Sequence, residues 1–124
     1  MCQMLLSIKP QFVNSIFSGE KLYEYRKNRC REGVEKIIIY ATAPEKKIVG
    51  EASISEVIEG AVSDVWNRTK EYSGISENIF YTYYRGKGKA VAFKLNNVVS
   101  YDVPLSLEDL GVSRAPQSFQ YLDI

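Results

Sequence analysis

The sequence predicts an α+β protein with a mostly antiparallel, barrel-like β-sheet and two to four short helices. Segments with strand character dominate the two ends of the 124-residue chain, and segments with helical periodicity lie between them. Strands and helices that are segregated in this way are typical of α+β folds. The length suits one domain, so we expect residues 1–124 to form a single domain.

The first half of the chain carries most of the strand signals. A helix is expected from Pro10, because proline suits the first helical turn, and Gly19 is expected to end it as a C-terminal cap. Residues 36–42 contain the continuous apolar run Ile37–Ala41, which predicts a strand that is buried on both faces. The expected strands are Met4–Ile8, 21–27, 36–42, 48–58 with a bend near Gly50, and 89–101, either continuous or broken at Asn96–Asn97.

The acidic middle of the chain is predicted to be helical. Ser63 is a candidate cap for a helix that ends near Gly74, and Ser76 is a candidate cap for a second helix that ends near Gly86. In the second helix, Ile79, Phe80, Tyr83 and Tyr84 are expected on one face. A helical turn is expected at 106–111, and the tail 116–124 packs back or adds a short strand.

Histidine is absent from the sequence, which excludes several kinds of catalysis. Ser-His-Asp and Cys-His mechanisms and H-E-x-x-H zinc sites all need that side chain. The two cysteines, Cys2 and Cys30, have no C-x-x-C spacing, so we expect free thiols and neither a disulfide framework nor a zinc site. We expect no cofactor and no metal, and any metal would need carboxylate ligands.

No apolar run approaches the roughly 20 residues of a membrane-spanning helix. The N-terminus also lacks the basic and then apolar pattern of a signal peptide. We therefore expect a cytoplasmic protein with no membrane partner.

The net charge is only +1, but the charges are unevenly distributed. Residues 1–50 and 85–95 are basic, and residues 51–84 and 96–124 are acidic. The two basic segments make one positive face if they fold together, although ordinary solvated surface explains the same pattern.

Residues 19–26 contain the pattern G-x-K-x-x-E-x-R, formed by Gly19, Lys21, Glu24 and Arg26. Glycine allows a tight exit from the helix, and Lys21 follows where its long side chain can reach into a cleft. Glu24 and Arg26 are two residues apart in a predicted strand, so their side chains point to the same side. A carboxylate beside a guanidinium can form an ion pair or bind a polar ligand.

This motif resembles the signature of the ASCH (activating signal cointegrator homology) family, whose barrel fold is similar to that of PUA domains. Ser7–Pro10, Ile37–Ala41 and Phe80–Gly86 are also similar to small prokaryotic or phage members. The resemblance extends to about Leu95. It implies a PUA-like barrel that binds RNA or another nucleic acid in a cleft around the motif.

One branch of the ASCH family consists of acetylcytidine amidohydrolases, in which the motif reads G-x-K-x-x-T-x-R and the threonine is the nucleophile. This sequence has Glu24 at that position, and a carboxylate is a poor replacement for a hydroxyl nucleophile. The resemblance makes Lys21 and Glu24 the candidate acid/base pair of an enzyme. Glu77 is a weaker candidate, as the counterpart of an assisting glutamate.

The predicted nucleic-acid-binding residues surround the motif and the second basic segment. They are Lys9, Lys21, Glu24, Arg26, Lys27, Arg29, Arg85 and Lys87. Among the nine tyrosines, Tyr40 and Tyr84 are candidates for stacking on bases, although core packing is the common role of tyrosine.

Three functions remain open at this point. The first is an RNA-binding or nucleic-acid-binding module, and the second is a hydrolase that acts on RNA or a modified nucleoside. The third is a protein-interaction module in a regulatory complex, for which the tail 113–124 is a candidate docking strand.

Overall fold

The computed structural model describes residues 2–123 and the side chains of residues 3–122. The strands are β1 (Cys2–Ile8), β2 (Tyr23–Arg26), β3 (Val34–Ala41), β4 (Lys47–Ala61), β5 (Lys89–Leu105) and β6 (Phe119–Asp123). The helices are α1 (Pro10–Ser18), α2 (Val62–Thr69) and α3 (Glu77–Tyr83), with the short 3-10 helices η1 (Lys70–Tyr72) and η2 (Glu108–Leu110).

Within residues 2–123 the strands form one six-stranded sheet in the order β2-β5-β4-β3-β1-β6. All neighbouring strands are antiparallel except β1 and β3, which are parallel because α1 and β2 lie between them in the chain. The sheet curls, but β2 and β6 are its two edges, so this part of the chain forms a half-barrel and not a closed barrel. The predicted α+β class is correct, and the barrel expected from the sequence is open.

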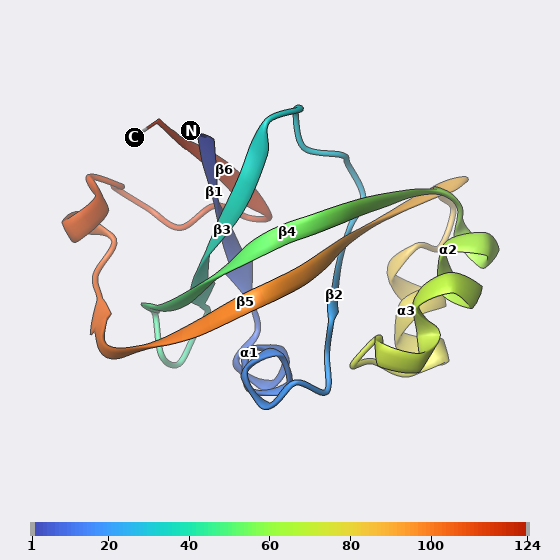
Figure 1. The fold of residues 1–124 in the computed structure, drawn as a ribbon, viewed down its shortest axis with the longest axis horizontal. Helices are drawn as coiled ribbons and strands as arrows, with labels where there is room; N and C mark the ends of the chain where they lie inside the picture. Colours follow the sequence, from blue (N-terminus) through green and yellow to red (C-terminus); the bar gives the residue numbers. More distant parts are fainter. Residues whose placement is uncertain (1, 124) are drawn as a thin grey trace.

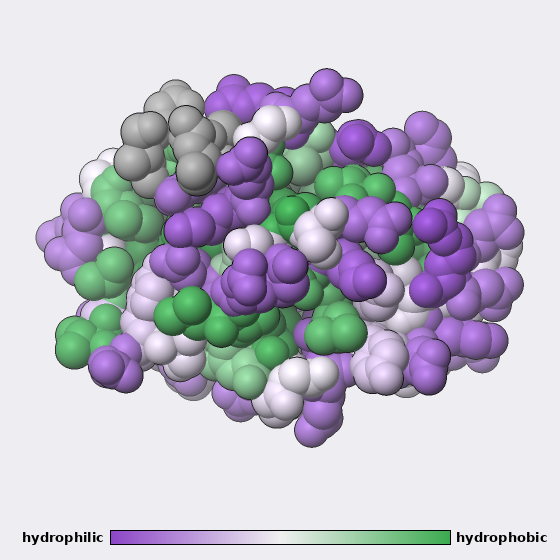
Figure 2. Space-filling model, in the orientation of Figure 1, coloured by the Kyte–Doolittle hydropathy of each residue, from purple (hydrophilic) through white to green (hydrophobic). Residues whose placement is uncertain are grey.

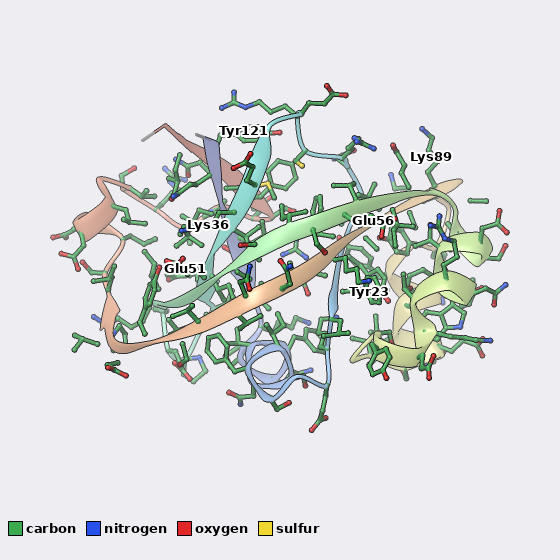
Figure 3. All side chains as sticks on the ribbon, viewed as in Figure 1. Tyr23, Lys36, Glu51, Glu56, Lys89 and Tyr121 are labelled. Carbon is green, nitrogen blue, oxygen red and sulfur yellow. The ribbon has the colours of Figure 1, made fainter. Side chains whose placement is uncertain are left out.

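Helices cover the curled sheet at separate places (Figure 1). In the figure, α2 and α3 lie together at one end of the long β4–β5 ribbon, and α1 lies below its middle. Tyr23 extends from β2 toward α2 and α3 (Figure 3), where it joins a buried cluster with Trp66 and Phe80. No helix within residues 2–123 has the length and hydropathy that would let it cross a membrane.

The central strands explain the two main cores of the sheet. In β3, Ile37 and Ile39 pack with α1 on one face, and Ile38 and Tyr40 pack on the other face against the segment that follows β5. This confirms the prediction of a strand that is buried on both faces, because alternate side chains point in opposite directions. Cys30 is a buried thiol in the first of these cores, and the side chain of Cys2 lies outside the described side chains.

Several local predictions are correct. Gly19 ends α1 with a φ of 87°, as expected for a C-terminal cap, and the hydroxyl of Ser76 accepts a hydrogen bond from the backbone N–H of Ile79. The pairing of β4 shifts register on both sides at Gly50, where the bend was expected. A Cβ there would lie 2.3 Å from the carbonyl oxygen of Val99, so only glycine allows this approach of the strands.

Other local predictions are wrong. Ser63 does not cap α2, because β4 runs directly into the helix and Ala61 occupies the N-cap position. The strand predicted at 21–27 is shortened to Tyr23–Arg26. The expectation for the tail is correct, by contrast, because Phe119–Asp123 add the short strand β6 beside β1 and Leu122 is buried.

The outer surface of the sheet combines ion pairs with exposed apolar side chains. The ammonium of Lys36 on β3 lies 2.8 Å from the carboxylate of Glu51 on β4 (Figure 3), and the hydroxyl of Tyr101 on β5 donates to the same carboxylate at 2.7 Å. Figure 2 shows hydrophobic side chains in separate patches among hydrophilic ones on this face of the molecule.

Candidate nucleic-acid-binding cavity

A cavity of about 730 Å³ opens where five segments of the chain meet. Its wall comes from the end of β1 and the start of α1, from β2, from the end of β3 with the following turn, from α3, and from residues 115–118. The motif residues Lys21, Glu24 and Arg26 all line this cavity, together with Lys9. Four of the predicted binding residues are therefore brought together.

Lys21 is held in the cavity wall by the turn after α1 and by the loop after η1. Its backbone N–H donates to the carbonyl oxygen of Ser15 at 3.0 Å, and its Nζ donates to the carbonyl oxygen of Ser73 at 2.7 Å. Gly74 packs directly on the stem, since a Cβ at Gly74 would lie 2.4 Å from the Cβ of Lys21. Only 2% of Lys21 is exposed, which is unusual for lysine.

Glu24 lies between the two cations of the motif. Its Oε1 is 3.7 Å from the Nζ of Lys21, and its Oε2 accepts a hydrogen bond from the NH1 group of Arg26. Arg26 is also anchored to the backbone, through the carbonyl oxygens of Tyr25 at 2.7 Å and Ser7 at 2.9 Å. All three charged side chains are buried, so the site is pre-organised by its own contacts.

The electrostatics of the site follow from this burial. Desolvation lowers the pKa of Lys21, the charge of Glu24 raises it, and the nearby charge of Arg26 lowers it again. The Nζ of Lys21 also lies 4.9 Å from the ring centroid of Tyr25 and 5.5 Å from that of Phe12. Burial raises the pKa of Tyr25 to about 12, so its hydroxyl stays neutral and donates to Thr69 at 2.8 Å.

The cavity lining carries more positive than negative charge. Lys9, Lys21, Arg26 and Lys46 are its cationic side chains, and Glu24 is its carboxylate. Lys9 and Lys46 are exposed, whereas the motif residues lie deeper. An anionic group can therefore meet cations at the rim of the cavity as well as inside it.

The other predicted site residues are not part of the cavity lining. Lys27 is exposed and its Nζ lies 4.7 Å from the ring centroid of Tyr83. Arg29 forms an ion pair with Glu59 at 3.2 Å. Arg85, Lys87 and Glu77 are exposed side chains outside the lining.

The two basic segments of the sequence meet at one carboxylate. Arg29 and Lys89 both form ion pairs with Glu59, at 3.2 and 3.6 Å. The acidic segment thus lies between them and reduces the positive face that the charge pattern suggested.

The two tyrosines that were candidates for base stacking differ in their surroundings. Tyr84 is 2% exposed, and its hydroxyl donates to the carbonyl oxygen of Arg26 at 2.7 Å and accepts from the backbone N–H of Val91 at 3.3 Å. A ring in that position packs in the core and has no face for a base. Tyr40 is also buried, but it belongs to the cavity lining.

The sequence did not indicate several polar residues of the cavity. Lys46 reaches the cavity from the turn after β3, and Gln117 and Ser118 reach it from the segment before β6. Lys46 has a positive φ of 53°, which is uncommon outside glycine. Apolar periodicity carries no information on such contacts, because they depend on how distant segments fold together.

Comparisons with known proteins agree with this fold. A family model described as "Domain of unknown function (DUF365)" matches residues 6–113. The ASCH domain-containing ribonuclease of Zymomonas mobilis is 32% identical over 125 residues, which cover 97% of this chain and 84% of that protein. The crystal structure of ASCH from Zymomonas mobilis has a TM-score of 0.88 at 30% identity, and the match covers 98% of this chain and 87% of that one.

Fold and sequence together define a PUA-like protein. The chain belongs to the ASCH family, in which DUF365 is included. A further relative, the large ribosomal subunit protein uL22 of Ureaplasma parvum, is 32% identical over 120 residues, and the match covers 96% of this chain but only 39% of that protein. The N-terminal domain of Staphylothermus marinus McrB shares the fold at 16% identity, with a TM-score of 0.54.

Proposed function

We propose that this protein binds RNA and that the cavity around Lys21, Glu24 and Arg26 receives part of the RNA. The observation that supports this most is the charge of the lining, in which Lys9, Lys21, Arg26 and Lys46 outnumber the single carboxylate. A volume of about 730 Å³ lies within the range of small-molecule sites and has room for a nucleotide. RNA is preferred as the nucleic acid because a relative 32% identical over nearly the whole chain is named a ribonuclease.

In this proposal the residues of the cavity have different roles. The exposed cations Lys9 and Lys46 bind phosphate at the rim, since exposed ammonium groups suit a mobile, solvated backbone. Apolar side chains such as Phe12 and Ile79 contact a base that has left its stack. Glu24 orients Lys21 and Arg26 and offers a carboxylate to the polar edge of that base.

The test compares two pairs of lysine and arginine substitutions. The double variant Lys9→Ala with Lys46→Ala removes the rim cations, and Arg85→Ala with Lys87→Ala removes two exposed cations outside the lining. The affinity for a short single-stranded RNA is measured as a function of salt concentration. Each lost phosphate contact lowers the slope of log affinity against log salt by about 0.7. The slope should therefore be about 1.4 smaller for the double variant of Lys9 and Lys46 than for the wild type. The double variant of Arg85 and Lys87 should keep the wild-type slope.

Equal slopes for the two double variants would contradict the assignment of the cavity. Unfolding by urea, measured in parallel, identifies any variant that has lost stability instead of contacts.

The second candidate function is hydrolysis of RNA, which the name of the same relative favours. Cleavage of RNA needs no hydroxyl from the protein, because the ribose 2′-oxygen can attack the neighbouring phosphorus and displace the 5′-oxygen of the next nucleotide, which leaves a 2′,3′-cyclic phosphate. Glu24 in place of threonine is therefore compatible with a ribonuclease, but it removes the nucleophile that an acetylcytidine amidohydrolase would use. Glu24 would accept the proton of the 2′-hydroxyl as the base, and Lys21, 3.7 Å from it, would donate a proton to the departing 5′-oxygen as the acid.

Labelled RNA and the same sequence with 2′-deoxy sugars distinguish the two functions. A ribonuclease of this kind cleaves only the first, and Glu24→Gln removes the cleavage. Acetylcytidine serves as a second substrate, and both are incubated with and without magnesium. RNA that stays intact while it binds would leave the binding module as the function.

We also propose that residues 1–124 act as one ASCH domain in the cytoplasm, as the sequence suggests. Fractionation of cells that express the protein tests the location.

A further inference from the structure

We propose that Tyr83 and Lys27 form a second nucleotide subsite at the mouth of the cavity, where the base that follows the bound nucleotide stacks on the tyrosine ring and its phosphate meets the lysine. This inference rests on the proposed RNA binding. It extends the ligand from a single nucleotide to a single-stranded segment of two or more.

The first observation is the division of α3 into two apolar faces. Phe80 and Tyr84 are buried, at 0% and 2% exposure, and fix the helix in the core. Ile79 and Tyr83 are also four residues apart, but 45% and 37% of them are exposed, and both line the cavity. This second face makes a surface that continues from inside the cavity into solvent.

The second observation is the placement of a cation on that surface. Lys27 directly follows β2 and the motif residue Arg26, and its Nζ lies 4.7 Å from the ring centroid of Tyr83. Arg29, by contrast, is engaged with Glu59. The exposed side chain of Lys27 can move from the ring to a phosphate while the tyrosine accepts a base.

The third observation is that the Tyr83 ring packs edge-on against a buried ring. Its centroid lies 4.8 Å from that of Tyr84, with an angle of 76° between the two planes. A ring that is held on one side by the core and exposed on the other loses little conformational entropy when a base stacks on it.

The chemistry of this surface selects the class of ligand. Every base has a π-face, so stacking on an aromatic ring tolerates any sequence, and a neighbouring cation follows the backbone. Bases in a duplex are already stacked and paired, so they cannot use the subsite. The expected ligand is therefore single-stranded RNA with little sequence preference at this second position.

The test uses 5′-UMP and the dinucleotide pUpU as probes, with binding measured by calorimetry. Tyr83→Ala should weaken pUpU binding about tenfold more than it weakens 5′-UMP binding, the difference typical of one stacked base. Tyr83→Phe retains the ring and should bind both probes like the wild type. Tyr72→Ala is the matched control, because Tyr72 is 48% exposed and lies outside the cavity lining.

Lys27→Ala provides an independent measurement on the same subsite. For pUpU, it should reduce the slope of log affinity against log salt by about 0.7, the value for one phosphate contact of a single strand. The affinity for 5′-UMP should not change.

Three outcomes overturn the proposal, and they can be told apart. If Tyr83→Ala binds both probes like the wild type, there is no stacking subsite, although the cavity still binds RNA. If it weakens both probes equally, Tyr83 is only a wall of the first site. If the wild type binds neither probe nor longer RNA, the proposed function itself fails.

Discussion

The ammonium of Lys21 donates a 2.7 Å hydrogen bond to the carbonyl oxygen of Ser73, 52 residues further along the chain. The backbone N–H of Leu22 donates to the carbonyl oxygen of Tyr72 at 2.9 Å, so the contact is reinforced at the next residue. The motif lysine thereby connects the entry of β2 to the loop between η1 and α3. A substitution at Lys21 affects both the cavity and this loop, so its functional assay needs a stability measurement beside it.

Gly74→Ala is expected to destabilise the protein by about 2 kcal/mol or more. The new Cβ would lie 2.4 to 2.8 Å from three carbons of Lys21, and the φ of 71° is unfavourable for alanine. Urea unfolding measures the loss. Gly86→Ala has a similar φ and no neighbour within 4 Å, so it isolates the backbone cost of about 1 kcal/mol.

Gly88→Ala completes this series, because Gly88 also has open space around it and no positive φ. It should change stability by less than about 0.5 kcal/mol. A Gly74 variant that is no worse than the Gly86 variant would show that the packing against Lys21 contributes nothing.

Glu24→Gln should cost roughly 3 kcal/mol of folding stability, because it leaves two buried cations without their carboxylate. The matched control is Glu56→Gln. Glu56 pairs with Arg68 at 3.8 Å, and about half of each side chain is exposed, so its loss should stay below about 1 kcal/mol. Similar losses for the two variants, measured by thermal unfolding, would contradict the buried network.

The cluster around Glu51 should make stability depend on pH in the acid range. Hydrogen bonds from Lys36 and Tyr101 hold the pKa of Glu51 below its ordinary value of 4.5. The folded pKa is lower than the unfolded one, so the stabilisation is present above pH 4.5 and is lost as the pH falls through the folded pKa.

Glu51→Gln should therefore be less stable than the wild type by about 1 kcal/mol at pH 7. The two proteins should converge as the pH is lowered below 4.5. Urea unfolding across this range checks the expectation, and a constant difference at all pH values would contradict it.

Tyr84→Phe should lower stability by about 1 to 2 kcal/mol, since it removes the buried hydroxyl that donates to the carbonyl oxygen of Arg26 at 2.7 Å and accepts from the backbone N–H of Val91 at 3.3 Å. Tyr81→Phe is the control, because Tyr81 is 39% exposed and keeps its ring contacts in that variant. Equal unfolding midpoints for the two variants would mean that the Tyr84 hydroxyl contributes nothing to stability.

The parts of the fold that depend on short-range patterns could be predicted from sequence. The apolar run at 37–41 predicted a strand buried on both faces, and Gly19 and Ser76 predicted two helix boundaries, because each signal lies within one turn or strand. Alternation along one strand also predicted that Glu24 and Arg26 point to the same side, whereas the place of Lys21 in the same cleft was implied only by the resemblance of the motif to the ASCH signature.

The remaining features depend on long-range packing. The parallel pairing of β1 with β3 results from how the intervening segment crosses the sheet, and the contribution of Lys46 to the cavity results from the curl of that sheet. Ser63 has a side chain that suits a helix cap, but α2 begins before Ser63, because the chain passes from β4 into the helix at Ala61. The ion pairs of Glu59 with Arg29 and Lys89 could not be predicted from the distribution of charge along the sequence either.

The pairing of β1 with β6 has a consequence for how the chain can be connected. Cys2 faces Asp123 across this antiparallel pair, so residues 2 and 123 lie side by side (Figure 1). A short linker could join them, and new ends opened at Gly88, in the exposed turn before β5, would give a circular permutant with the same sheet. Because residues 2 and 123 are neighbours, this fold can also be inserted into a surface loop of another protein without moving the two ends of that loop far apart.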